Sequence, residues 1–167
     1  FRCSTWNPLL QTVVVGATNH ICCYDPRIKV IVQDVPVSDI WGIRSISTEG
    51  YRATICTGSG FIRFSDLRTG KFLPSQTENR RSSTEHSVRT PLLAHTNHHD
   101  TTFVSPGYHI PGGIFDNQSP WYMTHFAPDP VEQAIYTHEF DPKGTRLFVA
   151  GGPSVQSIPG CNASLWW

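Results

Sequence analysis

The sequence predicts an all-β fold, a partial β-propeller of the WD-repeat type, because one pattern recurs at the spacing of propeller blades. TVVVGATNHICCYDPR at residues 12–27 and ATICTGSGFIRFSDLR at residues 53–68 each contain an apolar strand, a tight turn and a second strand ending in Asp-x-Arg. The equivalent aspartates, Asp25 and Asp66, are 41 residues apart. Because propeller blades repeat every ~40–45 residues, each copy is expected to form one blade.

A third copy of the pattern lies near the end of the chain. An apolar inner strand is expected at residues 134–140, a tight turn at Asp141-Pro-Lys-Gly144, and two further strands at residues 146–150 and 162–166. Proline fixes φ and glycine tolerates a positive φ, so both suit the turn. Residues 1–6 fit the end of an inner strand of the first copy.

These copies predict how the chain is divided. Residues 1–74 hold two WD-repeat blades, residues 75–131 an insertion, and residues 132–167 the last blade. About three blades do not close a ring, which needs about four to eight. We therefore expect the C-terminal part of a propeller, with further blades before Phe1 and an N-terminal strand completing the last blade. Its open sheet edges would make such a piece poorly soluble when alone.

The insertion is expected to be flexible. It is rich in Ser, Thr, Asn, His, Pro and Gly and lacks apolar periodicity, and such long segments are usually functional or disordered. Trp121, Tyr122, Met123 and Phe126 near its end are the exception. They could pack the returning chain on the propeller, which is the favoured interpretation, or form part of a partner surface.

The charge balance argues against nucleic acids and membranes as partners. The chain has 13 Lys and Arg residues against 13 Asp and Glu residues, whereas nucleic-acid-binding domains are strongly basic. Residues 1–74 carry eight basic and five acidic residues, so an anionic ligand would prefer this segment. No apolar run approaches the roughly 20 residues that span a bilayer.

The cysteines indicate the cellular compartment in which the protein is expected. Five cysteines without a CxxC pair lie mostly in apolar, strand-like runs, which is typical of reduced, buried thiols. Because disulfides are rare in the cytosol and nucleus, the protein is expected to be cytoplasmic and nuclear.

No catalytic motif is present in the sequence. A GxSxG elbow, an HExxH motif and a Gly-rich phosphate loop before a helix are all absent, so we expect a non-catalytic protein without a cofactor. The tract HTNHHD at residues 95–100 offers zinc ligands, but a flexible insertion does not hold them in fixed geometry, so no metal site is expected. His138, on the last inner strand, is expected to be structural.

The Asp-x-Arg endings are candidate docking points. Asp25 and Asp66 are expected to cap the turns beyond their strands, whereas Arg27 and Arg68 have no evident core function. A guanidinium can pair with carboxylate or carbonyl oxygens of another protein. An exposed arginine without a partner is the alternative, and the sequence leaves both interpretations open.

Arg44 and Tyr136 are candidates for a binding site at the propeller mouth. GIRSIS places Arg44 near the start of an inner strand, and Tyr136 occupies the matching register of the last copy. A cation in a confined mouth would favour an acidic peptide or carboxylate. An ordinary surface ion pair would explain Arg44 equally well.

These motifs resemble the WD-repeat substrate receptors of cullin-4 RING ubiquitin ligases, the cullin-4-associated factors. The similarity rests on DIWGIRSIS, on TGSGFIRFSDLRTGKFL, and on AIYTHEFDPKGTRLFVAGGP followed by NASLW. The matching blocks lie in residues 12–27, 39–73 and 134–166, about half of the chain. The chain is most similar to the receptors of proteins with acidic C-termini.

The resemblance implies a non-catalytic subunit that holds two C-terminal glutamates in a basic pocket. It assigns Arg44 to this pocket and implies that the other basic residues come from blades outside the chain. It assigns Arg27 and Arg68 to docking on the ligase adaptor, damage-specific DNA-binding protein 1, although SDLR lacks the more usual aromatic residue before Asp. The alternative is a generic WD-repeat scaffold unrelated to ubiquitin.

Overall fold

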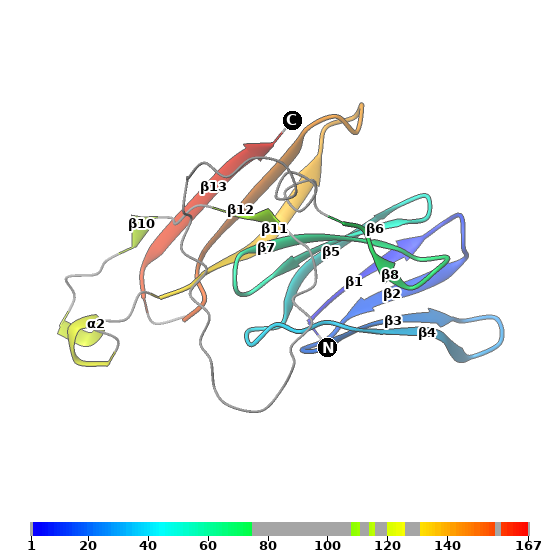
Figure 1. Cartoon of the computed structure of the whole chain (residues 1–167), viewed down its shortest axis with the longest axis horizontal. Helices are drawn as coiled ribbons and strands as arrows, with labels where there is room; N and C mark the ends of the chain where they lie inside the picture. Colours follow the sequence, from blue (N-terminus) through cyan, green and yellow to red (C-terminus); the bar gives the residue numbers. More distant parts are fainter. Residues whose placement is uncertain are drawn as a thin grey trace, which may run out of the picture.

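Three antiparallel β-sheets make up the computed structural model of the chain (Figure 1). The residues it describes are 2–74, 108–110, 114–115, 120–125, 131–155 and 158–166. The innermost strands β1, β5 and β11 are neighbours, and the sheets fan out from them as blades. Within the described residues the sheets do not close a ring, so the fold is the partial β-propeller that the repeat predicts.

The first blade contains four strands in chain order from the inside outwards. They are β1 (Cys3–Asn7), β2 (Thr12–Gly16), β3 (His20–Asp25) and β4 (Val30–Pro36). Burial alternates along β2 and β3, with Val14 and Ile21 fully buried, because successive side chains point to opposite faces of a sheet. The first copy of the repeat is therefore a pair of middle strands.

The second blade has an outer position that two short strands share. Its main strands are β5 (Ile43–Glu49), β6 (Arg52–Thr57) and β7 (Phe61–Asp66). Beside the end of β7 lies β8 (Lys71–Phe72), and beside its start lies β9 (Tyr108–His109). Residues 108–109 thus belong to a blade, although their composition places them in the insertion.

The third blade is built from β11 (Gln133–Phe140), β12 (Leu147–Pro153) and β13 (Gly160–Trp166). The outer position beside the start of β13 is taken by β10 (Ile114–Phe115). The sequence instead predicts an N-terminal strand there. Two residues that pair through their backbone carry no apolar periodicity, so the sequence gives no signal for β10.

One short helix, α2 (Pro120–His125), lies near the third blade (Figure 1). Tyr122 is buried and packs with Val131 and Ile158, as the packing interpretation of this aromatic segment predicts. Met123 is exposed, and both the Trp121 side chain and Phe126 lie outside the described residues. No helix in the described segments is long and apolar enough to cross a membrane.

Apolar side chains between adjacent blades form the core. Ile43 and Ile55 of the second blade pack with Val14 and Ile21 of the first, and a second cluster joins the second blade to the third. Fully burying such a side chain contributes about 1.5–3 kcal/mol. The blades are therefore held together by their faces, and the upper and lower ends remain for binding.

The two ends of the blades are defined by strand direction. We call the end at which β5 and β11 begin the upper end. Because β5 pairs antiparallel with β6 and β6 with β7, the last residue of β7 lies at the opposite, lower end. The start of β1 joins the upper end, since a side chain at Gly16 would meet both Cys3 and Ile43 at 2.7 Å.

Candidate functional site

Two equivalent β-bulges set the geometry of the upper end. In β5 the pairing passes from Ile43 to Ser45, which leaves Arg44 as the extra residue. In β11 it passes from Ile135 to Thr137, which leaves Tyr136 as the extra residue. Bulges redirect side chains and often occur beside binding sites.

Arg44 and Tyr136 meet across the neighbouring inner strands. The Arg44 Cζ atom lies 5.8 Å from the centroid of the Tyr136 ring, within the range of a cation–π contact. The Tyr136 hydroxyl donates a hydrogen bond of 2.8 Å to the carbonyl oxygen of Pro153, which fixes the ring. The structure therefore brings together the two residues that sequence register suggests for the mouth.

The guanidinium of Arg44 has unused hydrogen-bonding capacity. Its Nε atom is buried without a hydrogen-bond partner, and none of the ion pairs among the described residues includes Arg44. Burial lowers the pKa of Arg44, Arg2 lowers it further, and Tyr136 and Asp39 oppose this. Arginine nevertheless stays charged in proteins, so the upper end holds a cation suited to an incoming carboxylate.

The turn between β6 and β7 supports Arg44 from one side. A side chain at Gly58 would collide with Trp41, and its Cβ would lie 3.1 Å from the Arg44 Nε atom. The Gly58 amide also donates a hydrogen bond of 2.7 Å to the Gly42 carbonyl. Because Gly58 has no side chain, this turn can pack closely against the Nε atom of Arg44.

Two further arginines of the first two blades, Arg2 and Arg63, belong to none of the sequence motifs. Arg2 is exposed and close enough to Arg44 to lower its pKa, although the resemblance implies that the other basic pocket residues lie outside this chain. Arg63 is only 4% exposed, and its Nε and Nη1 atoms lack hydrogen-bond partners. Burial lowers the pKa of Arg63, and Asp39 opposes this. The alternating pattern of this strand places Arg63 at a core-facing position, and this is the sequence signal that could have identified it.

His138 bridges the inner strands of the second and third blades. Its Nδ1 and Nε2 atoms lie 2.7 Å from the hydroxyl oxygens of Ser45 and Ser47, respectively. Burial lowers the pKa of His138 to about 4, so the ring is neutral at neutral pH. Both ring nitrogens are engaged within the core, which is the structural role that the sequence suggests.

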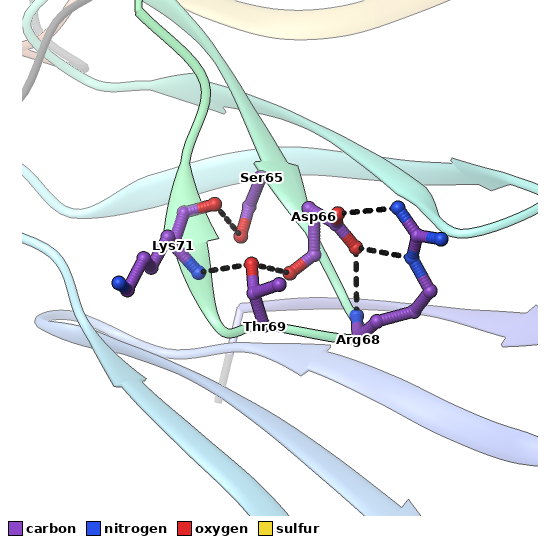
Figure 2. A network of polar contacts seen from close by, with 5 residues as sticks. All are labelled: Ser65, Asp66, Arg68, Thr69 and Lys71. Atoms are coloured by element: carbon purple, nitrogen blue, oxygen red, sulfur yellow. Dashed lines mark hydrogen bonds and ion pairs between the residues drawn. The ribbon is translucent and has the colours of Figure 1, made fainter.

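At the lower end, each Asp-x-Arg motif forms the same compact pair. The Asp66 carboxylate accepts hydrogen bonds from the Arg68 amide at 2.9 Å, from its Nε at 3.2 Å and from its Nη2 at 2.9 Å (Figure 2). Asp25 accepts the equivalent bonds from Arg27 at 2.9, 3.0 and 2.6 Å. The aspartates thus cap the turns, and the guanidiniums fold back on the same carboxylates.

This pairing keeps the aspartate of each motif ionised and holds the charged arginine beside it. The Arg27 side chain holds the pKa of Asp25 at about 2, and Arg68 likewise lowers the pKa of Asp66. The two arginine side chains remain 63% and 61% exposed, so both present the outer edge of the guanidinium to solvent. The Arg68 Cζ atom also lies 4.9 Å from the centroid of the Tyr51 ring.

The two motifs share one surface. Asp25 and Arg68 line the same hollow, of about 270 Å³, between the first and second blades. Asp66 and Arg68 also border a larger hollow, of about 540 Å³, together with Arg52 and Lys143. The two hollows share Arg68, so the lower end brings residues of both motifs onto neighbouring parts of one surface.

Metal binding has no support in the described part of the chain. No group of three or more His, Cys, Asp and Glu side chains there could hold a metal ion. The tract at residues 95–100 lies outside the described residues. The five cysteines, all of which lie in described strands, are free.

Blades that fan out from neighbouring inner strands, with Asp-x-Arg at the ends of two successive third strands, define a β-propeller protein. The family model of the DDB1- and CUL4-associated factor 12 β-propeller matches residues 2–167. The chain therefore belongs to this family of propellers.

Proposed function

We propose that the chain is part of a non-catalytic substrate receptor of a cullin-4 RING ubiquitin ligase, and that its upper end binds proteins with acidic C-termini. The family supports the association with the ligase, because the matching propeller is named for its association with DDB1 and CUL4. The observation that carries the tail specificity is Arg44, a charged group beside Tyr136 that takes part in none of the ion pairs among the described residues.

The chemistry of a C-terminal tail suits this site. A peptide ending in two glutamates brings an α-carboxylate and two side-chain carboxylates, and the nearby Arg2 adds a second cation. A carboxylate of the tail would pair with the guanidinium of Arg44, which takes part in no ion pair among the described residues. Charge-assisted pairs of this kind are about twice as strong as neutral hydrogen bonds.

The lower end is the proposed docking surface for the adaptor, damage-specific DNA-binding protein 1. Arg27 and Arg68 are held in fixed directions by their own aspartates, so little side-chain entropy would be lost on binding. Substrate and adaptor would thus occupy opposite ends of the blades. Such a protein would act in the cytoplasm and nucleus, where reduced cysteines are expected.

Binding of labelled peptides tests the substrate class. Peptides that differ only in their last two residues, Glu-Glu, Gln-Gln or Lys-Lys, are titrated with the purified full-length protein at low and high salt. The proposal predicts that Glu-Glu binds tightest and that its advantage shrinks with salt, because ions screen exposed charges. Equal affinity for all three peptides would instead favour a scaffold with another partner.

A further inference from the structure

A hollow of about 300 Å³ opens at the upper end of the third blade. Its walls are the side chains of Tyr136, Pro153, Val155 and Ile158, and its floor is the backbone of three glycines, at positions 151, 152 and 160. None of the described residues that line it has a charged side chain. The hollow therefore suits an uncharged group that can contact apolar side chains on its walls and backbone on its floor.

The glycines keep the floor of this hollow bare because the strands approach each other closely. A side chain at Gly151 would collide with the Ala134 carbonyl oxygen, and a Cβ at Gly152 would lie 2.8 Å from the Gly160 carbonyl oxygen. The Tyr136 hydroxyl is also occupied, since it donates to the Pro153 carbonyl. An occupant would thus meet the apolar side chains of the walls, the bare glycine backbone and a fixed aromatic ring.

Tyr136 belongs both to this hollow and to the contact with Arg44. An extended peptide advances about 3.3 Å per residue. A tail that reaches Arg44 with its terminal carboxylates and runs on over the neighbouring Tyr136 ring, 5.8 Å away, covers this distance within two or three residues of its end. Because Tyr136 borders the hollow, the residues that precede the acidic pair of such a tail come within reach of it.

We propose that this hollow binds an apolar side chain of the substrate tail, from one of the two residues that precede the acidic pair. This inference rests on the proposed function, because Arg44 sets where the tail ends. It adds a second requirement, so that the receptor selects an apolar residue followed by acidic residues. Tails with the same terminal charge would then differ in affinity.

Peptides ending in Glu-Glu, with Leu or Asn at the third or at the fourth position from the end, test the inference. Leu and Asn are similar in size, so the comparison isolates polarity. The wild-type chain is expected to bind the Leu peptide about fivefold more tightly at one of these positions, as partial burial of a leucine side chain requires. Val155→Asp should reduce this ratio to near one, whereas the control Val32→Asp, on the exposed outer strand β4, should preserve it.

The outcomes separate the two proposals. A preference for Glu-Glu over Lys-Lys without any preference for Leu overturns the apolar subsite and leaves the acidic-tail site standing. A Leu preference that persists in Val155→Asp overturns the assignment to this hollow. If the chain does not distinguish Glu-Glu from Lys-Lys, the proposed function fails and the subsite fails with it.

Discussion

Arg44 and Tyr136 are the extra residues of equivalent bulges in two neighbouring inner strands, and their side chains meet at 5.8 Å. A bulge adds one residue to a strand and redirects its side chain. Two such bulges at the same register aim an arginine and a tyrosine toward each other. The upper end of the blades thus has an ordered cation beside an aromatic wall.

Gly58→Ala should disturb this arrangement. The added Cβ would collide with Trp41 and lie 3.1 Å from the Arg44 Nε atom, and overpacking costs about 1–3 kcal/mol. We expect lower stability in urea titrations and weaker binding of Glu-Glu peptides. Gly50→Ala is the control for peptide binding: nothing lies within 4 Å of a Cβ there, but its φ of 57° strains alanine at the opposite end of β5, so stability should fall while affinity is kept. Unchanged peptide binding in Gly58→Ala would show that this turn does not position Arg44.

Removing both lower-end arginines should weaken adaptor binding. The Arg27→Ala, Arg68→Ala double variant loses two exposed, ordered guanidiniums, and truncating an interface arginine often costs about 2 kcal/mol. Co-precipitation with the adaptor should therefore fall sharply while peptide binding at the upper end is retained. Arg146→Ala is the control, an exposed arginine at the lower end outside any Asp-x-Arg motif. Full adaptor binding by the double variant would contradict the docking role.

His138 should make stability depend on pH below neutrality. Its folded pKa of about 4 lies below the unfolded value of about 6.5, so the unfolded chain binds more protons between these values. Stability should fall as the pH drops through this window, and His138 should contribute a loss of about 2 kcal/mol between pH 7 and pH 5. Urea unfolding at both pH values measures it, with His138→Gln as the variant that removes the dependence. Equal pH dependence in the two proteins would show that the ring is hydrated.

Asp25 should make the stability of the fold depend on pH in a more acidic range than His138 does. Its folded pKa of about 2 lies below the usual carboxyl value, so its contribution is complete above about pH 4 and is lost as the pH falls toward 2. Asp25→Asn should therefore be less stable than wild type at pH 7, and the difference should shrink on acidification. Thermal unfolding at several pH values measures this, with the exposed Asp34→Asn as control. A constant difference at every pH would contradict the carboxylate–guanidinium pair.

The strand order of the blades was predictable from the sequence because the repeat combines two signals. Alternating apolar residues mark the strands, and Asp-x-Arg marks the end of each third strand at Asp25 and Asp66. The short outer strands β9 and β10 were not predictable. Each has two residues and exists through backbone pairing with a neighbour, which leaves no side-chain pattern.

Only part of the candidate site could be read from the sequence. The register of the inner strands indicates Arg44 and Tyr136, but the bulges that turn them together depend on pairing with β6 and β12. The electrostatic effect of Arg2 on Arg44 acts between two blades, which spacing along one strand cannot reveal. Likewise, Asp-x-Arg predicts a capped turn, whereas the return of Arg68 to the same carboxylate is a matter of side-chain conformation.

The most direct test of the account is the affinity of a labelled peptide ending in Glu-Glu for the wild-type chain, for Arg44→Gln and for the lower-end control Arg146→Gln. The account predicts that Arg44→Gln loses about 2 kcal/mol or more, roughly 30-fold in affinity, because a charged contact is removed. The control should match wild type. Equal affinities for all three proteins would contradict the claim that Arg44 binds acidic C-termini.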